Sequence, residues 1–438
     1  MAHTSTYIED IFEGKFSEND KVAVNGWVYN NRSSGKVKFL LMRDGTATMQ
    51  CILFKGTTPE PALEAFTKLT QETSITAKGY LTKSPKAPGG WELQVEELDI
   101  VGTCEDYPIT PKEHGPAFLL DHRHLWIRSK RQHAILRIRS EVVASIRSFF
   151  DDKGFVGFDA PIFTSNPCEG STDLFEINYF DEETKAYLSQ TGQLYGEAGA
   201  MAFGKIYTFG PTFRAEKSKT RRHLTEFWMV EPEVAFMDLK GNMQLAEDMI
   251  RYVVMRVLKN KKRELEALER DTSKLESVAK PFAKLHYKEA AEILEKESKD
   301  GFKSGGDFGG GDETILASRF DTPLFVTNFP GAIKAFYMKE DPEDPSLTLS
   351  CDLLAPEGYG EIIGGAQREE SITRLLEKIA EHKLNPDDFQ WYLDLRRFGS
   401  VPHSGFGLGI ERFTAWICGT QHIRECIPFP RMLNRLSP

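Results

Sequence analysis

A chain of 438 residues is long enough for two or three domains with sizeable cores. No apolar run approaches the ~20 residues that a membrane-spanning helix needs, and the first residues lack the pattern of a secretory signal. Six scattered cysteines without a Cys-x-x-Cys pair exclude a disulfide framework and a zinc site. We therefore expect reduced thiols, a cytoplasmic location and no membrane partner.

The net charge of −10 argues against indiscriminate binding to nucleic acid, and we expect no DNA partner. Positive charge is nevertheless concentrated locally. Residues 120–150 carry seven Lys or Arg against two Asp or Glu, and residues 214–223 carry five against one. A local basic track is therefore compatible with the acidic whole.

The first hundred residues have the pattern of a small β domain. The Asp44-Gly45 dipeptide between two apolar runs is a strong hairpin signal. Five short strands with one interposed helix favour a Greek-key barrel of the OB type over residues 1–105, although a barrel without a ligand stays open on pattern alone. The expected strands span residues 22–28, 36–43, 49–54, 74–81 and 91–101, and the expected helix spans residues 59–69.

Residues 106–134 have the composition of a hinge followed by a basic, helix-prone connection. An amphipathic helix is expected over residues 137–150. The rest of residues 135–438 alternates strands and helices without βαβ regularity, which predicts an α+β domain with an antiparallel sheet. Residues 301–312 contain six glycines but no Gly-Lys-Ser/Thr that opens a helix, so we expect a flexible insertion, not a Walker loop.

A basic loop joins two expected strands, residues 207–214 and 224–236. The first strand leads into Phe213-Arg214-Ala215-Glu216, and the loop ends in Arg222-His223. Fixed arginines suit a phosphate under attack, because they stabilise charge that develops in the transition state. A basic loop by itself is typical of a solvated hairpin tip. The spacing Phe-Arg-x-Glu, loop, Arg-His-x-x-Glu-Phe is more specific than that.

Near the C-terminus, residues 403–412 alternate glycine with larger residues and end in Glu411-Arg412. A helix is expected over residues 413–418, stopped by Gly419. An arginine at a helix N-terminus favours an anion such as a terminal phosphate. Glycines alone would more often indicate tight packing.

Acidic and amide side chains form three further clusters. Asp352 and Glu361 are paired carboxylates of the kind that holds a magnesium ion bridging phosphates. Arg368 follows in Gly-Gly-Ala-Gln-Arg and could hold a carbonyl or carboxylate. The stretch from Ser189 to Tyr195 offers groups suited to a small polar amino acid, and Glu169 could hold its ammonium.

These segments resemble the three motifs of class II aminoacyl-tRNA synthetases, and the likeness covers essentially the whole chain. Residues 206–236 are similar to motif 2, residues 403–419 to motif 3, and the helix-strand-proline segment 137–163 to motif 1. Together with the barrel and the Asp-His-Arg-His-Leu-Trp-Ile-Arg segment, they resemble class IIb, the enzymes for aspartate, asparagine and lysine. The resemblance implies a homodimer formed through motif 1, including Pro161.

The resemblance implies a two-step reaction. An amino acid and ATP give an aminoacyl-adenylate, and the terminal ribose of tRNA then takes the acyl group; positioning and charge stabilisation carry the phosphate chemistry. The implied catalytic residues are Arg214, Glu216 and Arg412, and the implied magnesium ligands are Asp352 and Glu361. The implied ATP-binding residues are Arg214, Glu216, Arg222, His223, Leu224, Phe227, Glu361, Gly409, Ile410, Glu411 and Arg412.

Within class IIb the likeness is to the asparagine-specific branch, which implies asparagine, ATP and tRNA(Asn) as partners. Aspartate-specific members carry a lysine where this chain has Gly196 and a serine where it has Gly364. Losing a buried cation removes the attraction for a second carboxylate. Arg368 would then bond the amide oxygen and Glu226 the amide NH2. The implied amino-acid-binding residues are Glu169, Ser189, Gln190, Gln193, Glu226 and Arg368.

The barrel is expected to read the anticodon. Phe39 lies on a strand beside Arg32 and Gln50, which together offer one aromatic face and two hydrogen-bonding groups. Unpaired bases are recognised by stacking and by bonds to their exposed edges. The alternative is that Phe39 belongs to the barrel core, given its apolar neighbours.

Three other functions remain open at this point. One is an aspartate-activating enzyme that charges both tRNAs. Another is a tRNA-independent relative that makes asparagine, which the barrel disfavours because such relatives lack it. The last is a non-catalytic tRNA-binding module, which the presence of Arg214, Glu361 and Arg412 disfavours.

Overall fold

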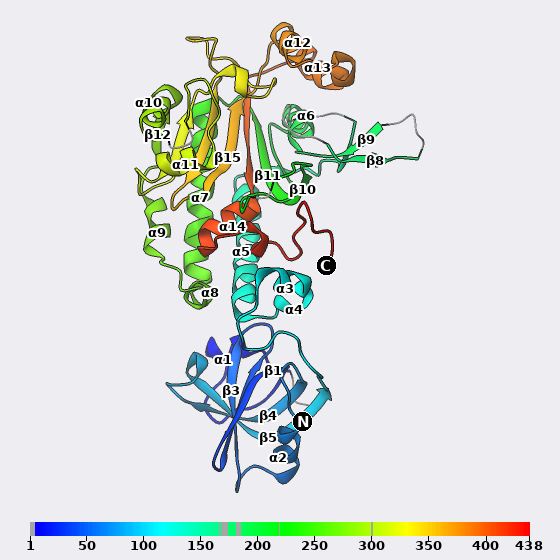
Figure 1. Ribbon diagram of the computed structural model, residues 1–438, viewed down its shortest axis with the longest axis vertical. Coiled ribbons are helices and arrows are strands. Elements are labelled where there is room, and N and C mark those ends of the chain that lie inside the picture. Colours follow the sequence, from blue (N-terminus) through cyan, green and yellow to red (C-terminus); the bar gives the residue numbers. More distant parts are fainter. Residues whose placement is uncertain (1–4, 166–167, 169–173, 181–184, 219, 299–300) are drawn as a thin grey trace. The chain divides into compact units, whose positions relative to one another are not determined.

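The computed structural model describes residues 5–165, 168, 174–180, 185–218, 220–298 and 301–438. It divides the chain into two compact units, Met1–Leu119 and Leu120–Pro438, so the division falls inside residues 106–134 (Figure 1). Among the residues described, no helix combines the length and the apolar character that crossing a membrane requires.

The first unit is a closed five-stranded barrel with strand order β1-β2-β3-β5-β4. Alternate residues such as Leu40 and Met42 point into an apolar core, as the period of two requires. The predicted hairpin turn is held by Asp44, whose Oδ1 accepts from the backbone of Thr46 at 2.8 Å and of Ala47 at 3.1 Å. The elements are α1 (Ile8–Phe12), β1 (Lys21–Ser34), β2 (Val37–Arg43), β3 (Thr48–Phe54), α2 (Glu60–Thr67), β4 (Ser74–Lys83) and β5 (Trp91–Gly102).

The second unit is built on an eight-stranded sheet with the order β12-β13-β14-β15-β16-β11-β10-β6. All neighbouring pairs are antiparallel except β12 with β13 and β10 with β6. The predicted barrel and α+β fold with an antiparallel sheet are therefore confirmed. The strands are β6 (Val156–Gly157), β10 (Lys205–Phe213), β11 (Glu226–Ala235), β12 (Ala283–His286), β13 (Leu324–Thr327), β14 (Ser350–Ala355), β15 (Gly360–Gln367) and β16 (His403–Gly409).

Three helices pack on this sheet and share one apolar core with it (Figure 1). They are α5 (Lys130–Asp152), α7 (Leu239–Asn260) and α14 (Ile410–Cys418). A separate small sheet, in the order β7-β9-β8, lies beside α6 (Figure 1). The remaining elements are α3 (Pro116–Asp121), α4 (Arg123–Trp126), β7 (Phe163–Thr164), β8 (Glu176–Asn178), β9 (Lys185–Leu188), α6 (Gln193–Phe203), α8 (Lys262–Ala267), α9 (Ser273–Glu276), α10 (Tyr287–Glu297), α11 (Gly310–Ala317), α12 (Ile372–Glu381) and α13 (Gln390–Arg397).

Helix α5 begins seven residues before the start that the sequence predicted. Its N-cap is Ser129, whose hydroxyl accepts from the backbone N–H of Gln132 at 3.3 Å. That cap was not recognised in the sequence because basic residues, not the usual acidic ones, fill the first turn. Helix α14 likewise begins at Ile410 instead of 413, and it ends at Gly419, which takes a positive φ of 69° as a C-terminal glycine does.

Residues 301–312, which their glycines predicted to be a flexible insertion, make packing and hydrogen-bond contacts with the second unit. Phe302 and Phe308 pack on an apolar cluster around α10, α11 and β13. The Tyr287 hydroxyl donates to the carbonyl of Gly306 at 2.6 Å and accepts from the N–H of Gly305 at 3.0 Å. The glycines allow tight turns, while the two phenylalanines supply the apolar surface that anchors the segment.

Candidate functional site

A cleft lies between the loop joining β10 to β11, the strands β15 and β16, and the start of α14. Strands β10 and β11 pair from Lys205 with Val234 to Phe213 with Glu226, which places the two ends of the loop side by side. Strand β16 pairs with both β11 and β15 and brings its alternating glycines under the cleft. The lining residues are Arg214, Glu216, Arg222, His223, Leu224, Phe227, Met229, Glu361, Ile362, Gly407, Gly409, Glu411, Arg412 and Ile423.

The structure thus gathers ten of the eleven predicted ATP-binding residues around one cleft. The eleventh, Ile410, is fully buried and belongs to the apolar core beneath. It was included because of its position in the glycine-rich motif, whereas its side chain is buried in the core. Four further residues line the cleft that were absent from the predicted set: Met229, Ile362, Gly407 and Ile423. None of them has a polar side chain that would have indicated a binding role. Only the pairing of the strands and the path of the chain after α14 bring them to the cleft.

Arg214 has the surroundings of an anion-binding group. Its guanidinium carbon lies 5.4 Å from the centre of the Phe227 ring. Its Nε is buried and has no hydrogen-bond partner among the described residues. A buried donor without a partner is costly unless a ligand accepts from it, so this atom is available for a phosphate oxygen.

Arg412 and Arg222 are held by the protein itself. Arg412 donates from Nη1 to the Glu361 carbonyl and from Nη2 to the Arg222 carbonyl, the latter at 3.3 Å. Arg222 donates to the Glu313 carboxylate at 3.0 Å and to the Thr314 hydroxyl at 3.2 Å. The Arg222 guanidinium is therefore turned towards α11, a contact that no local sequence pattern indicated.

Two acids, Glu411 in the cleft and Glu313 next to it, have their pKa values shifted by surrounding groups. Glu411 is 2% exposed and accepts from Arg139 Nη2 at 2.5 Å and from the Trp228 N–H at 3.0 Å. Burial raises the pKa of Glu411, and Arg139 opposes the rise. Burial also raises the pKa of Glu313 to about 7, and the neighbouring Glu361 adds to the rise. Through its bonds to Arg139 on α5 and to the backbone of Trp228 on β11, Glu411 anchors both elements to α14 at the edge of the cleft.

His223 is turned towards the loop that precedes it. Its Nδ1 bonds the Thr220 hydroxyl, and its Nε2 lies 3.7 Å from the Glu216 carboxylate. Burial lowers the pKa of His223, and the nearby Arg412 lowers it further. A neutral imidazole at neutral pH follows from both effects.

Asp352 on β14 and Glu361 on β15 face the same position, Gly364. A Cβ on Gly364 would lie 2.8 Å from Glu361 Oε1 and 3.8 Å from Asp352 Oδ1, so the glycine keeps this space open between the carboxylates. Burial raises the pKa of Asp352 to about 7; Lys334, which donates to its Oδ2 at 2.7 Å, opposes the rise and Glu361 adds to it. The oxygen donors and the open space fit a hard divalent cation.

Within the described residues there is no group of three or more His, Cys, Asp and Glu side chains arranged to hold a metal. Two carboxylates are nonetheless the usual protein share of a magnesium site, in which substrate phosphates and water complete the coordination.

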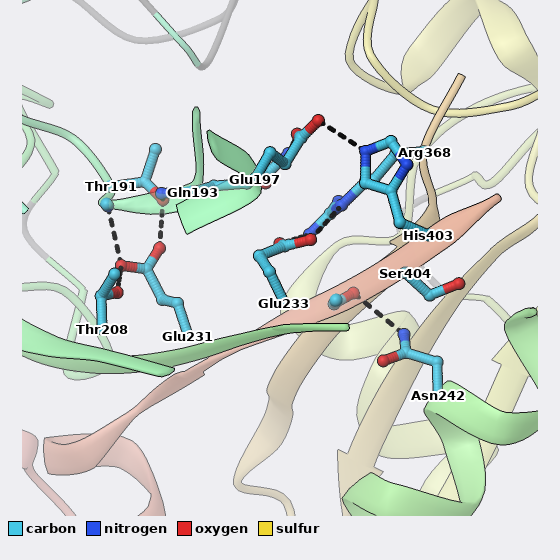
Figure 2. A network of polar contacts seen from close by, with 12 residues as sticks. Thr191, Gln193, Glu197, Thr208, Glu231, Glu233, Asn242, Arg368, His403 and Ser404 are labelled. Atoms are coloured by element: carbon cyan, nitrogen blue, oxygen red, sulfur yellow. Dashed lines mark hydrogen bonds and ion pairs between the residues drawn. The ribbon is translucent and has the colours of Figure 1, made fainter. Parts of the chain in front are cut away.

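A network of buried charged groups extends from the cleft along β11 (Figure 2). Arg368 donates to Glu233 at 2.5 Å from Nη2 and at 3.3 Å from Nε, and both side chains are almost fully buried. Burial raises the pKa of Glu233 to about 7, and Arg368 opposes the rise. Gly405 on β16 accommodates this pair, because a Cβ there would lie 2.1 Å from Glu233 Oε1.

Glu231 links this network to the cleft. Its side chain contacts the position of Gly407, one of the cleft glycines. The carboxylate accepts from the hydroxyl of Thr191, from the Gly192 N–H at 2.8 Å and from the Thr208 hydroxyl at 3.1 Å. Burial raises the pKa of Glu231. The protein therefore already occupies three of the roughly four acceptor sites of this carboxylate.

Glu197 on α6 is the centre of a second buried group. It accepts from Arg396 at 2.7 Å, from His403 at 2.9 Å and from the Tyr392 hydroxyl at 2.8 Å. Although burial opposes it, Arg396 and His403 hold the pKa of Glu197 below its usual range. Glu197 also accepts from the Gln193 amide at 3.1 Å. Because the Gln193 NH2 group donates this bond, the Gln193 amide oxygen faces away from Glu197.

The predicted amino-acid-binding residues divide between this network and other places. Gln193 and Arg368 belong to the network. Ser189 is buried, and its hydroxyl donates to the Thr191 carbonyl at 2.6 Å, while the Gln190 amide oxygen accepts from the Cys168 N–H at 3.3 Å. Glu169 lies outside the described residues.

The structure does not bring Glu226 to Arg368. Arg368 bonds Glu233, seven residues further along β11, which corresponds to about 23 Å at ~3.3 Å per residue. Glu226 also lies on the opposite face from Phe227 and Met229, since side chains alternate along a strand. Glu226 is therefore too far from Arg368 for the two side chains to hold one substrate amide between them, as the sequence analysis expected. Three glutamates lie on one strand, and only the register with β16 shows which of them meets Arg368.

The glycines at positions 196 and 364 lie beside these groups. A Cβ on Gly196 would be 3.3 Å from Glu233 Cγ and 3.6 Å from Thr208 Cγ2. A side chain at 196 would therefore point at the Glu233–Arg368 pair. Gly364 separates the two carboxylates described above.

On the barrel, Arg32, Phe39 and Gln50 occupy neighbouring positions on three paired strands. Phe39 is half-buried and lies outside the apolar core, and the Arg32 guanidinium carbon is 4.7 Å from its ring centre. The Gln50 amide donates to Glu92 at 2.8 Å. The structure brings the three predicted residues together on the outer face, with Glu92 as a neighbour that sequence reasoning missed.

Comparison with known proteins agrees with this arrangement. Residues 116–433 match the family of class II tRNA synthetases for D, K and N, and residues 22–101 match an OB-fold nucleic acid binding domain. The chain belongs to this class II synthetase family.

The similarity to individual members is higher still. The chain is 56% identical over 423 residues to an asparagine–tRNA ligase of Chloroflexus aurantiacus, covering 95% of this chain and 96% of that one. It is 54% identical over 425 residues to one of Thermus thermophilus, covering 95% and 97%. A crystal structure of asparaginyl-tRNA synthetase from Pyrococcus horikoshii complexed with asparaginyl-adenylate has a TM-score of 0.94 and 42% identity over the whole of both chains. Within the class II family, this chain belongs to the asparagine–tRNA ligases.

Proposed function

We propose that this chain joins asparagine to tRNA(Asn) in the cytoplasm, in two steps. ATP and asparagine form asparaginyl-adenylate and pyrophosphate, and the terminal ribose of the tRNA then accepts the asparaginyl group. The observation that carries the choice of asparagine is the buried Glu233–Arg368 pair beside a glycine at position 196.

A side-chain amide complements this pair. Arg368 uses Nε and Nη2 on Glu233, so Nη1 is not engaged by that acid and serves to donate to the amide oxygen. Glu233 then accepts from the amide NH2, the role that the sequence had given to Glu226. An aspartate side chain would place a second carboxylate beside Glu233 with no added cation from position 196, and a buried unpaired charge is costly.

The cleft binds ATP in this proposal. Arg214 holds the α-phosphate through its free Nε, and Arg412 at the start of α14 holds the γ-phosphate. Phe227 stacks on the adenine, and Glu216 with the backbone of residues 222–224 holds its edge. Both arginines stabilise charge that develops as the asparagine carboxylate attacks.

Asp352 and Glu361 would hold a magnesium ion, which would supply positive charge to offset that of the phosphates. Glu169 remains the predicted partner of the substrate ammonium. Gly196 leaves the space beside Glu233 free of an additional cation. Gly364 leaves the space between Asp352 and Glu361 free of an additional hydroxyl.

The test is ATP–pyrophosphate exchange with asparagine and with aspartate at equal concentration, followed by charging of tRNA(Asn). Exchange should require asparagine. Equal exchange with aspartate would replace the proposal with an enzyme that charges both tRNAs, and exchange without any charging would favour a tRNA-independent relative.

We further propose a homodimer formed through motif 1. Pro161 is exposed, and the apolar Ile162 and Phe163 beside it are 43% and 54% exposed, so this strip has surface to bury against a second copy. Sedimentation should give twice the mass of the chain. The Phe163→Asp variant should sediment with the mass of a single chain.

A further inference from the structure

Helix α11 begins where the glycine-rich segment ends and presents Glu313 to the ATP cleft. The Glu313 side chain is 14% exposed, and its Oε2 accepts from Arg222 Nη1 at 3.0 Å. The same oxygen accepts from the backbone N–H of Glu361 at 3.3 Å. One carboxylate therefore joins the motif 2 loop to β15.

Arg412 closes this arrangement from the other side. It donates to the carbonyls of Arg222 and Glu361, the two residues that Glu313 also holds. The motif 2 loop, β15 and α14 are thus tied by one carboxylate and one guanidinium. These are the three elements that carry the proposed phosphate-binding and magnesium-binding groups.

Two glycines make room for this contact. A Cβ on Gly360 would lie 2.1 Å from Glu313 Oε2, and one on Gly310 would lie 2.8 Å from Arg222 Nη1. Arg222 also donates to the Thr314 hydroxyl and to the carbonyls of Gly310 and Gly358. With this many acceptors on α11 and its surroundings, the guanidinium of Arg222 is committed to the protein.

We propose that Glu313 is a positioning residue for the ATP site. It fixes the motif 2 loop through the Arg222 side chain and sets the direction of β15 at Glu361 through the backbone. This assigns a role to the glycine-rich segment, which delivers α11 to the cleft. It also means that the Arg222 side chain holds the motif 2 loop against Glu313 instead of contacting ATP directly. The inference rests on the proposed function for its kinetic test but not for its structural one.

The first test replaces Glu313 by glutamine, which keeps the shape of the side chain and removes its charge. The KM for ATP in asparagine-dependent exchange should rise about tenfold, the effect of losing one charge-assisted bond. The KM for asparagine should stay within twofold, because Glu233 and Arg368 are untouched. Glu297→Gln is the matched control, since Glu297 forms an exposed ion pair with Arg319 just beyond α11. The control should change neither KM.

The second test needs no activity. The loop holds Lys217, Arg221 and Arg222, so trypsin cleavage within it reports how firmly it is held. Glu313→Gln should increase the cleavage rate severalfold relative to wild type and to Glu297→Gln. Arg222→Gln should raise the ATP KM by a similar factor, and the double variant should add little more, because both changes break one contact.

An unchanged ATP KM together with unchanged cleavage in Glu313→Gln would overturn the proposal. So would fully additive effects in the double variant. If circular dichroism shows that Glu313→Gln does not fold, Arg222→Gln decides by the ATP KM and by the cleavage rate at Lys217, a site that this variant retains. Absence of asparagine-dependent exchange in the wild-type enzyme would instead count against the proposed function and leave the cleavage test standing.

Discussion

The barrel and the catalytic unit use polar side chains in opposite ways. In the barrel, the core contains apolar residues such as Leu40 and Met42, and the candidate recognition residues Arg32 and Phe39 lie on its outer face. In the catalytic unit, charged pairs such as Glu233–Arg368 are themselves buried inside the fold. Function and stability should therefore be separable in the barrel and coupled in the catalytic unit.

The largest effect is expected for Arg368→Leu. This change leaves Glu233 buried without its partner, which should cost about 3–5 kcal/mol of unfolding free energy and abolish asparagine-dependent exchange. Urea unfolding and exchange are the measurements. Arg397→Gln is the control, because Arg397 pairs with Asp394 in an exposed ion pair, worth at most about 1 kcal/mol. Equal stability of the two variants would contradict the coupling.

Arg214→Ala and Arg412→Ala should each slow asparagine-dependent exchange by about 10²–10³, the usual result of removing one donor that stabilises a transition state. Of the two, Arg214→Ala should leave the protein better folded, because Arg214 Nε has no partner among the described residues whereas Arg412 holds two carbonyls. Near wild-type exchange in both variants would remove the proposed mechanism.

A smaller effect is expected for Phe39→Ala in the barrel. A stacked base is worth about 1–3 kcal/mol, so charging of tRNA(Asn) should fall roughly tenfold or more. Asparagine-dependent exchange and Tm should not change, because Phe39 lies outside the core. Leu40→Ala is the matched neighbour: Leu40 is fully buried, and its loss should cost about 2–5 kcal/mol of stability. If Phe39→Ala lowers Tm while charging persists, Phe39 is a core residue after all.

The smallest effect is expected at His422. Burial, helped by Arg424, lowers the pKa of His422 from 6.5 to about 4, and its Nδ1 accepts from the Arg424 N–H at 3.4 Å. The His422 ring therefore binds a proton more readily in the unfolded chain than in the folded protein. The contribution of the neutral ring to the free energy of unfolding is fully present above about pH 6.5 and is lost as pH falls towards about 4.

The measurement is the difference in Tm between pH 7.5 and pH 5 for wild type and for His422→Asn, which retains an acceptor. The wild type should lose more stability than the variant. The difference should be small, because the ring is only half-buried. An identical pH dependence of Tm in the two proteins would contradict the predicted contribution of His422.

The sequence determined what depends on local spacing. Alternating residues and the Asp44 turn specified the barrel strands, because side-chain period and turn chemistry act over a few residues. The segments around Arg214 and Arg412 likewise identified these two cleft arginines, because each occurs in a motif with fixed spacing.

Only the tertiary structure decided which distant residues meet. Strand register places Glu233, and not Glu226, beside Arg368, and packing of α11 brings Glu313 to Arg222. Phe302 and Phe308 hold the glycine-rich segment that composition had marked as flexible. The physical reason is common to all three: contacts between elements far apart in the chain depend on strand register and packed surfaces, which no local pattern records.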